Sequence, residues 1–112
     1  MIAEWLDIGW LHEIPVRGAR TVPVTDGEEI AVFRTGDNQV FALLNRCPHK
    51  RGPLSQGIIH GHSVSCPLHN WKIALATGHA QGDDKGCTPT IPVKVIAGRV
   101  HIARAATLAA AA

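Results

Sequence analysis

Two short stretches of the sequence carry residues that can bind metal ions. Cys47 and His49 are separated by one residue, and Cys66 and His69 by two, with sixteen residues between the two pairs. Thiolate sulfur and neutral imidazole nitrogen are both metal ligands, and a proline follows the cysteine of each pair. Two matched pairs supply four ligands, so the pattern predicts one metal centre built from two loops.

The spacing of these ligands distinguishes between two kinds of centre. Structural zinc sites usually combine Cys-x₂₋₄-Cys and His-x₃₋₅-His pairs, so that one short loop gives one kind of ligand. Here each loop gives one cysteine and one histidine. If the cysteines bind one iron and the histidines another, each loop spans both irons. The pattern therefore favours a two-iron cluster, and a structural zinc module without redox activity is the alternative.

Each ligand pair follows a predicted strand. Residues 40–44 precede the first pair and residues 62–65 precede the second. Both runs are rich in β-branched or apolar residues, and turn signals flank them. If the two strand ends are adjacent, they hold the two loops facing each other.

The rest of the chain predicts an all-β fold. Short strands at close spacing, separated by Gly and Pro turns, are typical of a sandwich or barrel. The Gly36-Asp37-Asn38 turn joins two antiparallel strands, and Ala97-Gly98 joins two strands whose apolar residues alternate. No helix of twelve or more residues is predicted. The predicted strands are 21–24, 29–34, 39–44, 62–66, 71–75 and the two arms of the 93–102 hairpin.

Length and composition bound the class of protein. The chain has 112 residues, 46% of them hydrophobic and 18% charged, which predicts one folded domain over residues 1–104. Residues 105–112 are almost all alanine, and we expect this tail to be disordered. A net charge of +2 is too small for a nucleic-acid-binding surface, and no apolar run is long enough to cross a membrane. Three cysteines and an acidic N-terminal segment without a secretory pattern favour the cytoplasm.

The double motif at Cys47, His49, Cys66 and His69 resembles that of the Rieske iron–sulfur family. This resemblance implies a 2Fe–2S cluster, with the two cysteines on the inner iron and the two histidines on the outer iron. It implies a Rieske-type antiparallel sandwich or barrel, in which two loops form a cluster-binding subdomain. No catalytic residues are assigned, and the expected role is one-electron transfer.

The resemblance also bears on the reduction potential. High-potential members of the family carry a serine and a tyrosine that donate hydrogen bonds to the cluster, at the positions occupied here by Trp71 and Ile73. They also carry an extra cysteine in each loop, which this sequence lacks. Rieske centres span roughly −150 to +300 mV. We therefore expect a potential at the low end of this range.

A longer segment, residues 66–95, is similar to the small subunit of assimilatory NAD(P)H-dependent nitrite reductase. The resemblance lies in the Thr-Gly at 77–78, the Gly/Asp-rich run at 82–86 and the Thr-Pro-Thr at 88–90. It implies a non-catalytic electron-transfer subunit of a cytoplasmic enzyme that reduces nitrite to ammonium, whose large subunit holds FAD and sirohaem. The alternative is a free Rieske ferredoxin that serves an aromatic-ring oxygenase and its reductase.

A few further residues have two interpretations each. Cys87 lies outside both loops and is either a reactive thiol or substitute ligand, or a small loop residue without a role. His60 and His62 flank Gly61 in a predicted hairpin turn, where exposed side chains are expected rather than accessory ligands. Trp71 either packs against the core or shields the cluster from water.

Overall fold

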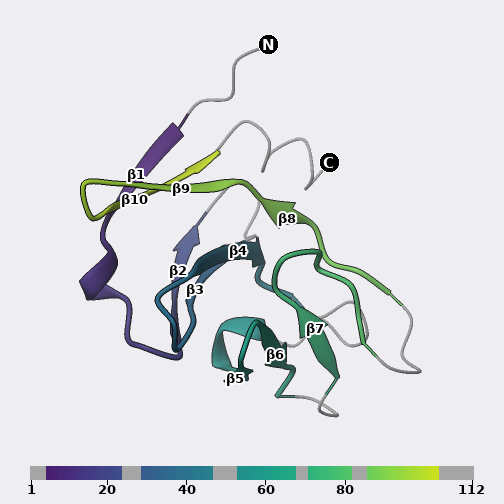
Figure 1. Cartoon of the computed structure of the whole chain (residues 1–112). Coiled ribbons are helices and arrows are strands. Elements are labelled where there is room, and N and C mark those ends of the chain that lie inside the picture. Colours follow the sequence, from purple (N-terminus) through teal and green to yellow (C-terminus); the bar gives the residue numbers. More distant parts are fainter. Residues whose placement is uncertain (1–4, 24–28, 47–52, 68–70, 82–85, 104–112) are drawn as a thin grey trace.

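Three small antiparallel sheets make up the structure, a computed structural model that describes residues 5–23, 29–46, 53–67, 71–81 and 86–103 (Figure 1). Their strand orders are β1-β10-β9, β2-β3-β4-β8 and β5-β6-β7. The strands are β1 (Trp5–Trp10), β2 (Gly18–Pro23), β3 (Glu29–Arg34), β4 (Val40–Leu44), β5 (Ile58–His60), β6 (Ser63–Ser65), β7 (Lys72–Ala74), β8 (Thr90–Ile91), β9 (Val93–Ile96) and β10 (Arg99–Ala103).

The helical content of the described segments is small. Two 3₁₀ helices occur, η1 (Leu11–Glu13) and η3 (Leu54–Gln56). Because every other regular element of these segments is a strand, the all-β prediction is confirmed. Within these segments no helix is long and apolar enough to cross a membrane.

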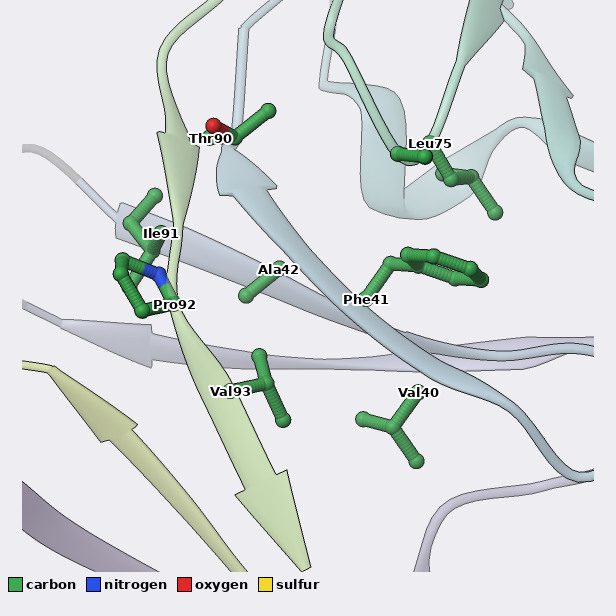
Figure 2. A pocket seen from close by; sticks show the side chains of 9 residues that line it. Val40, Phe41, Ala42, Leu75, Thr90, Ile91, Pro92 and Val93 are labelled. Atoms are coloured by element: carbon green, nitrogen blue, oxygen red, sulfur yellow. The ribbon is translucent and has the colours of Figure 1, made fainter.

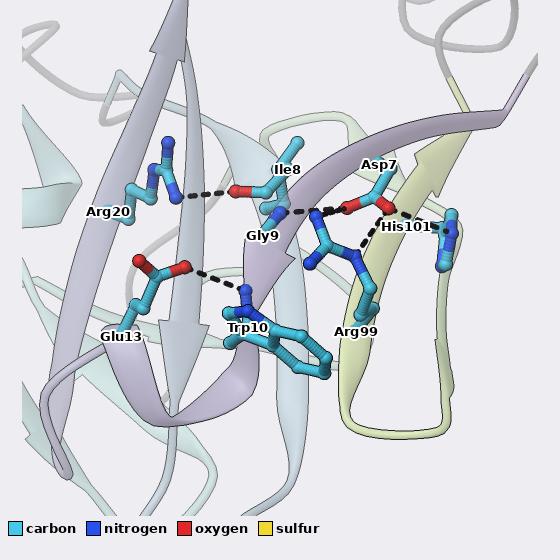
Figure 3. Close-up of polar contacts among 8 residues, drawn as sticks. All are labelled: Asp7, Ile8, Gly9, Trp10, Glu13, Arg20, Arg99 and His101. Carbon is cyan, nitrogen blue, oxygen red and sulfur yellow. Dashed lines mark hydrogen bonds and ion pairs between the residues drawn. The ribbon is translucent and has the colours of Figure 1, made fainter.

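The first sheet is closed by a tight hairpin and a bulge. Ala97 and Gly98, both at positive φ, form the two-residue turn between β9 and β10, as the sequence predicts. β1 pairs with β10, and its register shifts between Asp7 and Gly9, where Gly9 adopts a φ of 117°. The Asp7 carboxylate accepts hydrogen bonds from the Gly9 backbone and from Arg99, which fixes the bulge against β10 (Figure 3).

The second sheet is the central layer of the fold. Residues 30–33 of β3 are all fully buried, although strand side chains alternate between two faces. Ile30 and Val32 pack in one apolar core with residues of the first sheet, such as Val100. Ala31 and Phe33 pack in a second core with residues of the third sheet. Both faces of β3 are therefore covered, each by a different sheet.

The third sheet is built from strands of three residues each. The β5–β6 turn carries His60, Gly61 and His62, and Gly61 adopts a φ of 56°, so the predicted turn is confirmed. Its buried side chains, Ile59, Val64 and Ile73, lie in the second core. This small sheet therefore depends on the central sheet for its apolar interior.

Three of the ten strands were not predicted. β1 contains Gly9 and a bulge, which interrupt the alternation that marks a strand. β5 and β8 have three and two residues, too few to show a period. The strands predicted at 21–24, 62–66 and 71–75 correspond to β2, β6 and β7 with shifted ends, and the predicted tail, 105–112, lies outside the described residues.

Candidate metal centre

The structure describes one of the four predicted ligands and the ends of both loops. Cys66 is described, whereas Cys47, His49 and His69 lie outside the described residues. The ligand assignment at these three positions therefore remains a prediction.

Cys66 follows β6 directly and is fully buried. It lies in the second core, in the same apolar cluster as Leu54 and Ile73. Its backbone N–H donates to the carbonyl of Trp71 at 2.7 Å, which closes the loop that contains His69. A bare thiolate is unfavourable in apolar surroundings, whereas a metal-bound thiolate shares its charge with the cation. The site of Cys66 therefore fits the role of an inner cluster ligand.

The two loops do not start from strands of the same sheet. β4 pairs with β3 and β8 in the central sheet, whereas β6 pairs with β5 and β7 in the third sheet. The strands face each other across the second core, where Leu43 of β4 and Val64 of β6 are both buried. Packing between two sheets, rather than hydrogen bonding within one, brings the loop bases together. Periodicity within one strand cannot reveal which sheet the strand joins.

Three residues frame the loops: Gly57 is expected from the sequence to shape the loop around the cluster, whereas Leu54 and Asn45 were not singled out. Leu54 in η3 is fully buried in the second core, and it follows the first loop. The side chain of Asn45 accepts a hydrogen bond from the backbone N–H of Ser55 at 2.8 Å. Gly57 lies so close to β6 that a Cβ atom would stand 2.1 Å from the carbonyl oxygen of Ser65. A glycine and an asparagine near a ligand motif are signals of tight local geometry, but the sequence alone does not show their partners.

The positions linked to the reduction potential contain no hydroxyl group. Ile73 is fully buried in β7, and Trp71 is partly buried against the second core. Packing of Trp71 against the core is therefore confirmed, and its shielding of the cluster remains a prediction. Neither side chain can donate an O–H hydrogen bond to a cluster sulfur.

A side-chain hydrogen bond links the third sheet to the central sheet. His62, in the β5–β6 turn, lies 3.0 Å from a carboxylate oxygen of Asp37, in the β3–β4 turn, and its ring packs against Phe41. The hydroxyl of Thr35 and then His62 hold the pKa of Asp37 below its usual value of 3.8. His62 is exposed, as predicted, and its Nε2 faces a carboxylate of the central sheet.

Cys87 is exposed and lies in an isolated β-bridge with His79. The neighbouring Thr88 is buried, and its backbone N–H donates to the carbonyl of Gly78 at 2.8 Å. These contacts place Cys87 on the surface of the segment that returns from the third sheet to β8. The choice between a reactive thiol and a loop residue without a role stays open.

A groove of about 310 Å³ lies beside β4 and does not provide acid–base chemistry (Figure 2). Among the described residues that line it, only Thr90 has a polar side chain and none has a titratable one. General acid–base catalysis needs a titratable group at the reacting atoms, so this groove is not suited to it. The lining residues are Val40, Phe41, Ala42, Leu75, Ala76, Thr90, Ile91, Pro92 and Val93.

The buried Cys66 thus follows a small three-stranded sheet that packs on a larger antiparallel base. The Rieske [2Fe-2S] domain family matches residues 4–93, and the chain belongs to this family. The protein is therefore a one-electron carrier with a Rieske-type 2Fe–2S cluster. The family resemblance and the fold expected from the sequence are confirmed.

Relatives of two kinds resemble this chain. The ferredoxin component of the naphthalene 1,2-dioxygenase system from Pseudomonas aeruginosa is 32% identical, over 91% of this chain and 97% of its own length. A solved structure assigned as the small subunit of an NADH-dependent nitrite reductase from Mycobacterium tuberculosis has a TM-score of 0.82 and 27% identity, with 93% of this chain and 97% of that chain covered. A ferredoxin complexed with the oxygenase of carbazole 1,9a-dioxygenase has a TM-score of 0.79 and 27% identity, with 88% of this chain and 92% of that chain covered.

Proposed function

We propose that this chain is the electron-transfer small subunit of a cytoplasmic assimilatory nitrite reductase. Nitrite would be reduced to ammonium on a separate large subunit that holds FAD and sirohaem. This chain would contribute no catalytic residue and would carry electrons one at a time. The segment at residues 66–95, with its resemblance to such subunits, is the observation that carries the proposal.

The described part of that segment lies beside the bases of the two predicted ligand loops. It runs from Cys66 through β7 and returns to β8 of the central sheet. The hydroxyl of Thr88 donates to the carbonyl of Leu44 at 3.4 Å, and the Leu44 N–H donates to the carbonyl of Pro89 at 3.0 Å. Leu44 is the last residue of β4, which leads into the first loop. The segment that distinguishes the proposed subunit thus contacts the bases of both loops.

We assign Cys47 and Cys66 to the inner iron and His49 and His69 to the outer iron. When bound, the cluster accepts and returns a single electron. The residues of this chain would hold the cluster and exclude water from it. Cys66 lies in the second apolar core, and Leu54 and Ile73 belong to the same core. We place the histidine side toward the partner, because imidazole is the ligand expected nearer the solvent.

We further propose a reduction potential at the low end of the Rieske range, roughly −150 to +300 mV. Hydrogen bonds to the sulfurs raise the potential of an iron–sulfur cluster. Trp71 and Ile73 provide no hydroxyl donor at the two positions concerned. A low potential suits electrons that arrive from a nicotinamide or flavin donor.

The second candidate is a free ferredoxin that serves an aromatic-ring oxygenase. The dioxygenase ferredoxin from Pseudomonas aeruginosa supports it, because the similarity extends over nearly the whole of both chains. The two candidates share the cluster and its ligands and differ in the partner. A permanent subunit stays bound to its enzyme, whereas a ferredoxin dissociates after each transfer.

Purification of the tagged chain from its own cells distinguishes the two candidates. We expect it to co-elute in a fixed ratio with a large protein that shows the absorption of sirohaem, and we expect the eluted complex to oxidise NAD(P)H only when nitrite is present. A matched preparation with Cys66→Ser should retain the complex without the small-subunit cluster. A chain that elutes alone and supports turnover of a purified ring-hydroxylating oxygenase would establish the ferredoxin instead.

A further inference from the structure

Asn45 lies two residues before Cys47, and its side chain makes hydrogen bonds in two directions. Oδ1 accepts from the backbone N–H of Ser55 at 2.8 Å, and Nδ2 donates to the carboxylate of Glu29 at 3.2 Å. The backbone N–H of Asn45 also donates to the carbonyl of Glu29 at 2.8 Å. Asn45 therefore joins the start of β3, the end of β4 and η3.

The hydrogen bond from Ser55 to Asn45 closes the first loop at its base. Ten positions separate the two residues, and Cys47 and His49 fall between them. Bringing the ends of a flexible loop together costs conformational entropy, and a contact across the base offsets that cost before any ligand binds. Both bonding partners of the Asn45 side chain lie in described, folded segments.

The closed base of the first loop also contacts the base of the second loop. Gly57, the residue after η3, would bring a Cβ atom to 2.1 Å from the carbonyl oxygen of Ser65 and 2.9 Å from a methyl group of Val64. Ser65 is the residue before Cys66. The chain that Asn45 holds through Ser55 therefore touches β6 immediately before the ligand of the second loop.

We propose that Asn45 is a positioning residue for the cluster: its side chain fixes the first ligand loop on η3 and thereby sets the separation between the two ligand loops. The proposal rests on the assignment of Cys47, His49, Cys66 and His69 as ligands. Asn45 does not need to touch the cluster. Its effect passes through Ser55 and the contact between Gly57 and Ser65.

Three variants of the cluster-loaded protein test this role. Asn45→Ala leaves the partly buried N–H of Ser55 without its acceptor. The loss of this hydrogen bond should raise the equilibrium constant for opening the base of the first loop about tenfold. We expect the cluster to be lost about ten times faster in the presence of an iron chelator. Asn45→Asp combined with Glu29→Gln keeps the acceptor for Ser55 without placing two carboxylates side by side, and should restore most of the wild-type lifetime. Gln56→Ala, which changes an exposed side chain of η3, is the matched control and should match the wild type.

The electron paramagnetic resonance (EPR) line width of the reduced cluster gives a readout that a merely structural role would not move. If Asn45 sets the loop separation, Asn45→Ala should broaden the signal, whereas the Asn45→Asp/Glu29→Gln double variant and Gln56→Ala should not. Equal chelator lifetimes and equal line widths for Asn45→Ala and Gln56→Ala would overturn the positioning role alone. Full cluster content in a Cys66→Ser protein would overturn the ligand assignment beneath it, so the two failures are distinguishable.

Discussion

The base of the molecule, formed by the first and central sheets, differs from the third sheet in how it obtains stability. Most base strands have four to six residues, and the base core draws on both of its sheets, from Ile30 and Val32 to Val100 and Ile102. The strands of the third sheet have three residues each, and their core is completed by Ala31, Phe33 and Leu43 of the base. An isolated sheet of such short strands is marginal in water. The third sheet therefore depends on the base for its apolar interior, and we expect the base to stay folded without the cluster because its own core does not include Cys66.

The largest effect expected from this comparison is that of Cys66→Ser. A serine hydroxyl is a poor replacement for a thiolate ligand of iron, so we expect the cluster to be lost. The base core does not include Cys66, so its strands should remain folded. Iron and sulfide content should fall to background while the far-UV circular dichroism keeps most of its β signal. Loss of the whole β signal would show that the base also depends on the cluster.

Leu54→Ala should weaken the junction between the two parts. Leu54 is fully buried in the second core, and removing a buried leucine side chain costs about 2–5 kcal/mol of unfolding free energy. Ile102→Ala is the matched substitution in the base, where Ile102 is also fully buried. Urea unfolding should show comparable losses for both variants. The rate of cluster loss should rise for Leu54→Ala only, and an equal rise for both would contradict the division into two parts.

Gly57→Ala should produce a smaller loss at the same junction. The added methyl group would meet the carbonyl oxygen of Ser65, and overpacking of this kind typically costs about 1–3 kcal/mol. Gly36→Ala is the control, because its methyl group would meet only the side chain of Arg17. We expect Gly57→Ala to lower the cluster content after reconstitution and Gly36→Ala to leave it unchanged. Normal cluster content in Gly57→Ala would mean that the loop bases tolerate a shift.

The smallest effect concerns the two carboxylates Asp37 and Asp7. The pKa of Asp37 is lowered by the Thr35 hydroxyl and then by His62, and that of Asp7 chiefly by its hydrogen bond from Arg99. Each ionised carboxylate stabilises the fold above the ordinary pKa of 3.8, and this contribution disappears as the pH falls through the lowered folded-state pKa.

Asn substitutions at these two positions should therefore lower the urea midpoint slightly at neutral pH and not at all in strong acid. Asp37→Asn should also hasten cluster loss near neutral pH, since Asp37 bridges the base to the third sheet through His62. Asp7→Asn should not, because the partners of Asp7 within the described part of the chain all lie in the first sheet. The same cluster lifetime in both variants would show that the contact between Asp37 and His62 does not help to retain the cluster.

The sequence predicted much of the base because its hairpins combine alternating apolar residues with distinct turns. The β3–β4 and β9–β10 pairs both follow such patterns, and both were found. β1 was missed because of its bulge, and β5 and β8 because of their length. Ile30 and Val32 lie in one core, and Ala31 and Phe33 lie in another, because a different sheet covers each face of β3. Local periodicity does not reveal which sheets pack against a strand.

The candidate site was predicted from its ligands rather than from its frame. Cysteine and histidine spacing predicts a two-loop centre directly, because metal chemistry limits the residue types. The contribution of Asn45 depends on a backbone group ten positions away, and that of Gly57 on a strand in contact with it. Such contacts form only when the loop bases are folded together, so they cannot be predicted from the sequence pattern.

The EPR spectrum of the purified, dithionite-reduced protein tests the central claim most directly. A Rieske-type cluster with two cysteine and two histidine ligands should give a signal whose average g value lies below that of the free electron, together with about two irons and two sulfides per chain. A colourless protein that contains one zinc ion and gives no signal after reduction would contradict the account.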